Sequence, residues 1–326
     1  MPVLAGVLVM GVLAGVSALR PATPPLPTHP ERGPAQMEAA SDAQIRAASW
    51  NICGEAGGSF GDAGYCPHRD EPDRKVGAIL NLVKDKQLNV VMLQEACSGP
   101  LVEDQEHGNA SMLDRLKAGL GPTWSAAWAE MPRPGGRSDC RGALGGTLSV
   151  VVAVQGKIVQ TTRKPLPVPH GSRSTDRYSQ PTVLCVQVQN WRTEVCTTHL
   201  VNDDLTAEAY AAELAALTDF VAARPPESPQ VIIGGDFNTR RWGSWLKPLH
   251  DRYDECDEQA YGPGDIVRQP TIGPATGDGK IDYLFANVAF TGCEVPVNGY
   301  QNTSITAVPN GISDHAPIVG YTSVLP

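Results

Sequence analysis

Two features that many metal-binding and nucleic-acid-binding proteins carry are missing from this sequence. Its eight cysteines include no Cys-x-x-Cys pair and match no zinc spacing, which argues against a structural zinc module. Basic residues are also few: 26 Lys and Arg stand against 35 Asp and Glu, for a formal net charge of −9. This balance argues against a broad basic surface for nucleic acid. It remains compatible with an enzyme that holds one phosphodiester with the help of cations.

The chain also lacks any internal repeat or second linker, so we expect one catalytic domain over residues 42–326. Residues 3–19 form an apolar run that contains Val16-Ser17-Ala18, which predicts a signal peptide over residues 1–18 and a secreted, extracellular protein. No Lys or Arg precedes the run, and an uncleaved anchor with an extracytoplasmic domain is the alternative. Residues 19–41 are rich in proline and predict a disordered linker.

An even number of cysteines predicts disulfide bonds and an oxidising compartment. Residues 183–189 and 193–198 are typical of two strands joined by a short turn, which would place Cys185 opposite Cys196. Proximity in the sequence suggests the pairs Cys53–Cys66 and Cys256–Cys293, which leaves Cys97–Cys140 as the fourth pair. The alternative is that some cysteines are free buried thiols.

Beyond the linker, strand patterns alternate with helix patterns. Apart from the two strands around the predicted turn, we expect strands at 46–52, 89–94, 146–154, 281–286 and 316–322, and one starting at 231. Helices are expected at 72–87, 111–120 and 206–223. On the first helix, Val76 and Ile79 belong to the apolar stripe, and Lys75 falls on the outer, charged face.

The stretch from Val231 to Asn238 combines a buried-strand pattern with chemistry. Three β-branched residues lead into Gly234 and Gly235, which allow close packing or a turn. Asp236 and Asn238 alternate with a phenylalanine, so both polar groups can project to one side. An ordinary strand-to-turn junction is the alternative. Similar polar groups stand at or near the other expected strand ends: Asn51, Glu95, His199, Asp282, Asp314 and His315.

These residues fall in six short motifs: Ser49-Trp50-Asn51, Leu93-Gln94-Glu95, Thr198-His199-Leu200, Gly235-Asp236-Phe237-Asn238, Ile281-Asp282-Tyr283 and Ser313-Asp314-His315. In motifs and order the chain resembles the endonuclease/exonuclease/phosphatase (DNase I-like) superfamily, as a secreted, bacterial-type member. The resemblance implies an α/β (α+β) fold, a four-layer α/β/β/α sandwich of two facing mixed β-sheets flanked by helices. It also implies a site at one end of the sandwich.

The resemblance further implies hydrolysis of a phosphate ester with a divalent metal. Asn51, Glu95 and Asp314 would be the metal ligands, and their oxygen atoms suit Mg²⁺, Mn²⁺ or Ca²⁺ better than zinc. Asp236 would orient or deprotonate the attacking water. Asn238 would hold that water or a phosphate oxygen.

Two histidines complete the implied site. His315, oriented by Asp282, would act as a general base or as a cationic stabiliser. His199 would bond a phosphate oxygen or protonate the leaving group. Arg141 is the candidate for binding the substrate phosphate, since the family often has a basic residue near this place.

The substrate is less closely specified. Secretion favours a Mg²⁺-dependent endonuclease acting on nucleic acid, with a phospholipid phosphodiesterase of sphingomyelinase type or an inositol polyphosphate-type phosphatase as alternatives. We expect a monomer with no stable protein partner. Trp242 and Trp245, beside Arg240 and Arg241, would grip nucleic acid, enter a membrane interface or pack on the core.

Overall fold

The computed structural model describes residues 44–54, 66–99, 110–132, 140, 144–167, 180–201, 207–223, 229–239, 244–257, 271, 279–303 and 309–323. The predicted signal peptide and linker lie outside the described residues, as do Arg141, Arg240, Arg241 and Trp242. None of the helices in the described part of the chain is long and apolar enough to cross a membrane.

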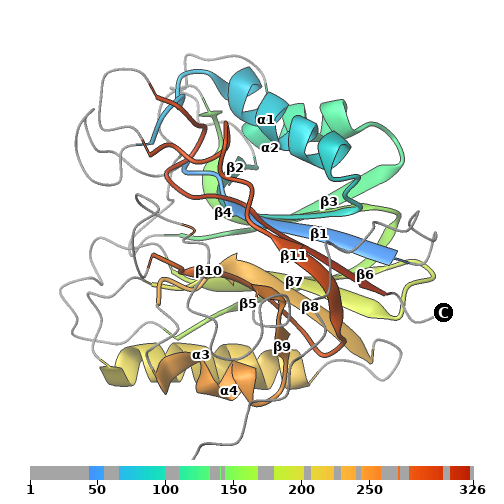
Figure 1. Cartoon of the computed structure of the whole chain (residues 1–326), viewed down its shortest axis with the longest axis vertical. Coiled ribbons are helices and arrows are strands. Elements are labelled where there is room, and N and C mark those ends of the chain that lie inside the picture. Colours follow the sequence, from blue (N-terminus) through green and yellow to red (C-terminus); the bar gives the residue numbers. More distant parts are fainter. Residues whose placement is uncertain are drawn as a thin grey trace, which may run out of the picture. The chain divides into compact units, whose positions relative to one another are not determined.

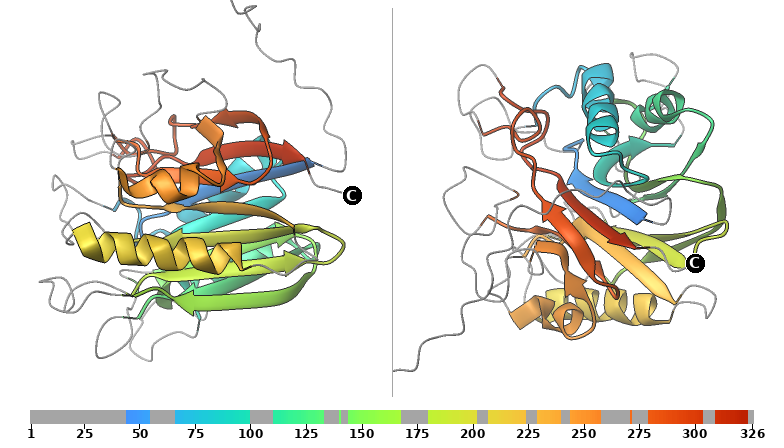
Figure 2. Two further views of the ribbon diagram at one scale, coloured as in Figure 1. Left: turned by 90° about the horizontal axis from the view of Figure 1, so that it is seen from below. Right: turned by 45° about the vertical axis from the view of Figure 1, so that its right-hand side comes forward.

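Two mixed sheets lie face to face, with helices on their outer sides (Figures 1 and 2). The first has the order β11-β12-β1-β2-β4-β3. Its strands are β1 (Gln44–Asn51), β2 (Val90–Ser98), β3 (Trp124–Glu130), β4 (Thr147–Gln155), β11 (Phe290–Glu294) and β12 (Ile318–Ser323). Only the β1–β2 pairing in this sheet is parallel.

The second sheet has the order β5-β6-β7-β8-β10-β9. Its strands are β5 (Ile158–Pro165), β6 (Thr182–Val188), β7 (Thr193–His199), β8 (Gln230–Asp236), β9 (Asp254–Glu255) and β10 (Asp282–Ala286). Here only β7 and β8 run parallel. The four-layer α/β/β/α sandwich implied by the sequence motifs is confirmed.

Helices cover the outer face of each sheet (Figure 1). The first sheet carries α1 (Pro72–Asp85) and α2 (Met112–Leu120), and the second carries α3 (Ala207–Ala222), a short turn η2 (Ser244–Leu246) and α4 (Lys247–His250). Helix α1 begins with a proline, and α2 begins with a capping box formed by Ser111 and Asp114. The three longer helices were predicted within two residues of these bounds.

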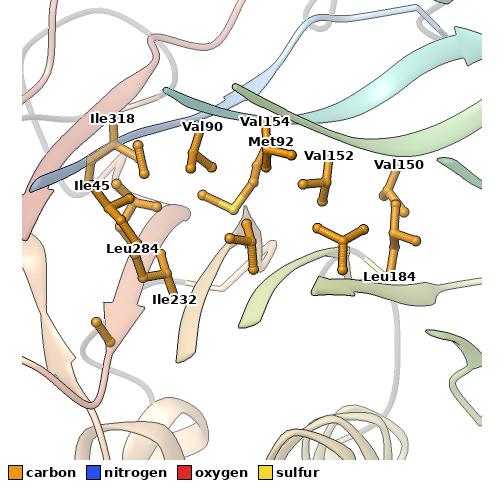
Figure 3. Close-up of a cluster of buried hydrophobic side chains, with 14 of the residues drawn as sticks. Ile45, Val90, Met92, Val150, Val152, Val154, Leu184, Ile232, Leu284 and Ile318 are labelled. Atoms are coloured by element: carbon orange, nitrogen blue, oxygen red, sulfur yellow. The ribbon is translucent and has the colours of Figure 1, made fainter. Parts of the chain in front are cut away.

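Apolar side chains fill the three spaces between the four layers. Between the sheets, residues such as Val90, Met92 and Val152 face Leu184 and Ile232 (Figure 3). The other two spaces lie between each sheet and its helices, and Trp50 and Phe237 are fully buried in them. Because the inner strands of both sheets are covered on two faces, their continuous apolar runs follow from the architecture.

The predicted strands correspond to the inner strands of both sheets, whereas β3, β5, β9 and β11 were not predicted. Each of these four is at the edge of its sheet. Strand β2 also differs from the prediction, which ended it at Gln94. It continues to Ser98 through a bulge between Leu93 and Ala96, because Glu95 takes a left-handed φ of 49°.

The structure pairs all eight cysteines as the sequence suggested: Cys53–Cys66, Cys97–Cys140, Cys185–Cys196 and Cys256–Cys293. Cys185 and Cys196 face each other in the register of β6 and β7, as the hairpin predicted. The alternative of free thiols is wrong.

Gly234 of β8 allows the two sheets to approach each other. A Cβ atom there would lie 2.8 Å from Met92 Sδ and 2.9 Å from Ser49 Cβ, both in the opposite sheet. We therefore expect Gly234→Ala to lower the free energy of unfolding by about 1–3 kcal/mol through overpacking. Urea denaturation measures this change.

Gly77→Ala in α1 is the matched control, since a Cβ at that position would meet nothing within 4 Å. It should raise the free energy of unfolding by about 0.5–1 kcal/mol, because alanine favours helix more than glycine does. Equal effects of the two substitutions would contradict this account of sheet packing.

Candidate active site

Strand register places three of the predicted residues side by side in the second sheet. His199 at the end of β7 is the register partner of Asp236 at the end of β8. Asp236 is also the register partner of Asp282, the first residue of β10. All three side chains are buried. One edge of the sheet therefore presents an imidazole and two carboxylates in a row.

The first sheet contributes Asn51 and Glu95 to the same place. Asn51 Nδ2 donates to Glu95 Oε1 at 2.9 Å and to Asp236 Oδ2 at 3.0 Å. The bulge at Glu95 turns this residue out of the regular strand alternation. The amide of Asn51 thus joins carboxylates from both sheets. Its own Oδ1 accepts the backbone N–H of Cys53 at 2.9 Å.

The loop before β12 is attached to the end of β1. Ser313 Oγ donates to the backbone carbonyl of Asn51 at 2.6 Å and lies 3.4 Å from Asp314 Oδ1. Trp50 Nε1 donates to the carbonyl of His315 at 2.9 Å. These bonds fix Asp314 next to the segment that carries Asn51.

His315 and Asp282 form the expected pair, with Nδ1 of the imidazole 2.8 Å from Asp282 Oδ2. Burial lowers the pKa of His315, but the negative charges of Asp282, Asp314 and Asp236 together raise it well above 6.5. These charges therefore favour the imidazolium form of His315, whose Nε2 lies 3.8 Å from Asp236 Oδ2. Burial also raises the pKa of Asp282, and the charge of His315 opposes that effect.

His199 has a different environment. Its Nε2 lies 3.0 Å from Asn238 Nδ2 and 3.4 Å from Asp236 Oδ2. The same Asn238 amide donates to the carbonyl of Leu200 at 2.8 Å, so its nitrogen is the atom that faces His199. The Asn238 amide group is therefore placed to donate a hydrogen bond to Nε2 of His199.

Asn238 is held in a left-handed conformation, with φ of 48°. Its backbone N–H donates to Asp236 Oδ1 at 2.8 Å, and Tyr210 Oη in α3 donates to the carbonyl of Phe237 at 2.7 Å. Phe237 itself is buried on the opposite side, as the alternation predicted. Helix α3 thereby fixes the turn that presents Asp236 and Asn238.

Three residues that support the site were not predicted: Tyr210, Thr271 and Lys75. Tyr210 was expected only as a core residue of its helix, and Thr271 lies in a polar stretch with no strand or helix pattern. Thr271 Oγ1 accepts the N–H groups of Ile281 and Asp282, each at 3.1 Å. The placement of Lys75 on the outer face of α1 is wrong: its side chain is fully buried.

The donor atoms suit a hard divalent cation. Glu95 and Asp236 bring two carboxylates to one amide, and Asp314 adds a third close by, all of them oxygen donors. Asp236, Asp282 and His315 also offer ligand atoms within 4.8 Å of one another. A protonated imidazole has no lone pair to give, so this second group is less suited to a cation.

The structure therefore joins seven of the predicted residues in one network: Asn51, Glu95, His199, Asp236, Asn238, Asp282 and His315. Asp314 adjoins it, and Arg141 lies outside the described residues. Trp245 packs edge-on against Tyr210, with ring centroids 6.0 Å apart.

Known proteins resemble the chain in sequence and in fold. A family model described as the Endonuclease/Exonuclease/phosphatase family matches residues 48–315. No curated protein matches. An endonuclease/exonuclease/phosphatase from Beutenbergia cavernae DSM 12333 is 21% identical with a TM-score of 0.58, covering 86% of this chain and 72% of its own.

Two further solved structures share the fold. A mannosyl-6-phosphatase from Bacteroides thetaiotaomicron VPI-5482 is 14% identical with a TM-score of 0.61, covering 86% of this chain and 100% of its own. The human Nocturnin catalytic domain with bound sulfate is 15% identical with a TM-score of 0.58, covering 87% of this chain and 94% of its own.

The His315–Asp282 pair predicts a pH dependence that NMR can measure. In the wild type we expect His315 to titrate well above 6.5, so its charge stabilises the fold at low pH and this contribution is lost as pH rises through its pKa. Asp282→Asn should lower the pKa of His315, because the nearest negative charge is removed while burial remains.

Asp251→Asn is the control, since Asp251 is an exposed carboxylate paired with Lys247. It should leave the titration of His315 unchanged. A His315 titration that does not move in Asp282→Asn would show that the pair does not set its charge.

Proposed function

Because the chain belongs to the endonuclease/exonuclease/phosphatase family, we propose that it is a secreted, metal-dependent endonuclease that hydrolyses phosphodiester bonds in nucleic acid. The protein is a hydrolase acting on phosphate esters, as members of this family are. The observation that carries the finer proposal is the network centred on Asp236. In it, the Asn51 amide of the first sheet, the imidazole of His199 in the second sheet and the imidazole of His315 in the loop before β12 all lie near the single carboxylate of Asp236.

The family generally depends on a divalent metal, and Asn51, Glu95 and Asp314 would hold it here as Mg²⁺, with Mn²⁺ and Ca²⁺ as alternatives. When bound, the ion supplies positive charge to the phosphate and to the departing oxygen. This contribution fits a chain with a net charge of −9, which cannot grip a polyanion by its own surface charge.

The roles that we assign to the side chains follow from which of them carry a proton. Asp236 is placed to orient the attacking water and to accept its proton, with Asn238 fixed beside it. His315 Nδ1–H donates a hydrogen bond to Asp282 Oδ2. The second ring N–H of the imidazolium, on Nε2, is therefore the one that faces Asp236. We therefore assign His315 the role of cationic stabiliser of the phosphoryl oxygens, in preference to general base.

His199 is suited to contact a phosphate oxygen or to protonate the leaving group. In the structure its Nε2 accepts from Asn238 and faces Asp236 at 3.4 Å. A proton on Nε2 would turn this nitrogen into a donor next to the reacting phosphate.

Secretion and substrate rest on separate observations. Four disulfides support an oxidising compartment. Trp245 packs against Tyr210, so its ring contacts the protein and does not enter a membrane interface. This contact favours nucleic acid over phospholipid as the substrate. A phosphatase on small phosphorylated molecules is the second candidate, favoured by the likeness in fold to a mannosyl-6-phosphatase.

Product analysis separates these candidates. The mature protein is incubated with supercoiled plasmid, sphingomyelin vesicles or an inositol polyphosphate, each with Mg²⁺ and with EDTA. We expect nicked and linear plasmid in the presence of Mg²⁺ and none with EDTA. Intact plasmid together with released phosphocholine would instead indicate a phospholipid phosphodiesterase. Intact plasmid together with released inorganic phosphate would indicate a phosphatase.

His315→Ala should reduce the rate of plasmid cleavage by about 10²–10³-fold, as loss of a preorganised group that stabilises the transition-state charge does. His250→Ala is the matched control, because His250 lies in α4 against Phe285 under the second sheet. It should keep the wild-type rate. A wild-type rate in His315→Ala would refute the role assigned to His315.

A further inference from the structure

Lys75 in the first turn of α1 is a buried lysine with no exposed surface. Its ammonium group donates to three backbone carbonyls: Ile52 at 2.8 Å, Cys53 at 3.2 Å and Ile312 at 3.0 Å. An ammonium group has three N–H donors, so these carbonyls satisfy it completely. The side chain is therefore held in place by the backbone.

The three carbonyls belong to the two segments that present metal-binding residues. Ile52 and Cys53 directly follow Asn51 at the end of β1. Ile312 precedes Ser313 and Asp314 in the loop before β12. These segments are far apart in the sequence and are also joined by the bonds from Ser313 Oγ to the Asn51 carbonyl and from Trp50 Nε1 to the His315 carbonyl. Lys75 thus acts as a bridge between them.

Burial of this lysine is costly, which indicates a specific role. Desolvation lowers the pKa of Lys75 to about 7, while the charges of Asp314 and Glu95 act in the opposite direction. An apolar residue at this position of the helix would avoid that cost. Cys53, whose carbonyl Lys75 holds, has a left-handed φ of 59°, a backbone conformation that needs support from its surroundings.

We propose that Lys75 is a positioning residue of the divalent-cation site, which holds the segments carrying Asn51 and Asp314 at the separation needed to share one ion. This inference rests on the metal ligands of the proposed function. A partner behind the ligands typically changes metal affinity by about 10–100-fold when it is removed.

Charge and geometry make opposite predictions for the loss of Lys75. A positive charge near the site repels a cation, so its removal would tighten metal binding if charge were its main effect. Loss of the bridge would instead let the two segments separate and weaken binding. The sign of the change therefore distinguishes a positioning role from a purely electrostatic one.

The test is the dissociation constant for Mn²⁺, measured without substrate by EPR of the free ion. We expect Lys75→Met to weaken Mn²⁺ binding by about 10–100-fold. Lys75→Arg, which keeps a charge and several N–H donors, should fall between that variant and the wild type. Unchanged or tighter binding in a folded Lys75→Met protein would overturn the proposal.

Ile79→Ala is the matched control for stability. Ile79 is one turn further along α1 and is fully buried, but it belongs to the apolar core. This variant should melt at a lower temperature and bind Mn²⁺ like the wild type. If Ile79→Ala weakened binding as much as Lys75→Met does, a general loss of stability would explain both and the proposal would fail.

Circular dichroism establishes whether each variant is folded. If Lys75→Met does not fold, Lys75→Gln takes its place, and wild-type affinity in that variant counts against the proposal. Because Mn²⁺ binding is measured without substrate, a wild type that binds Mn²⁺ but leaves plasmid intact disproves the endonuclease and not the role of Lys75.

Discussion

The side-chain amide of Asn51 links the two sheets of this protein at the end that carries the site. Its nitrogen donates to Glu95 of the first sheet and to Asp236 of the second, at 2.9 and 3.0 Å. The bond to Asp236 requires the sheets to come very close at this end, and Gly234 permits that approach. Buried Gln94 adds a second link from β2 to Thr197 in β7 at 2.9 Å. The chemistry at Asp236 therefore depends on how the sheets pack as much as on the residues themselves.

The sequence predicted the inner strands well because each is covered on both faces and so consists of continuous apolar residues. Edge strands carry no such signal. Strand β5 has the polar run Gln160–Lys164 and is largely open to solvent, and β3 consists of alanine, serine, tryptophan and a terminal glutamate. Strand β11 contains Gly292 next to a shift in register. Each edge strand pairs with a single neighbour, and none of the four has the continuous apolar run by which the inner strands were predicted.

The site residues also divide into those that the sequence predicted and those that it did not. Residues at the ends of inner strands were found because a carboxylate or imidazole after an apolar run is conspicuous. The residues that fix them were missed, since their bonds go to the backbone of distant segments, as with Tyr210 and the Phe237 carbonyl. Lys75 shows the limit most clearly: a helical pattern assigns lysine to solvent by its charge, and only the folded chain reveals three carbonyls that receive it. The bend at Glu95 likewise depends on the partner strand β4.

The register that sets Asp236 beside Asp282 has a cost for the molecule. Two acidic groups occupy adjacent buried positions, where burial and the charge of Asp236 both raise the pKa of Asp282. A chain optimised for heat resistance alone would replace one of them by an apolar residue of similar size. Their presence marks a compromise in which part of the conformational stability is given up for reactivity, and laboratory evolution toward higher melting temperature would be expected to remove this pair early.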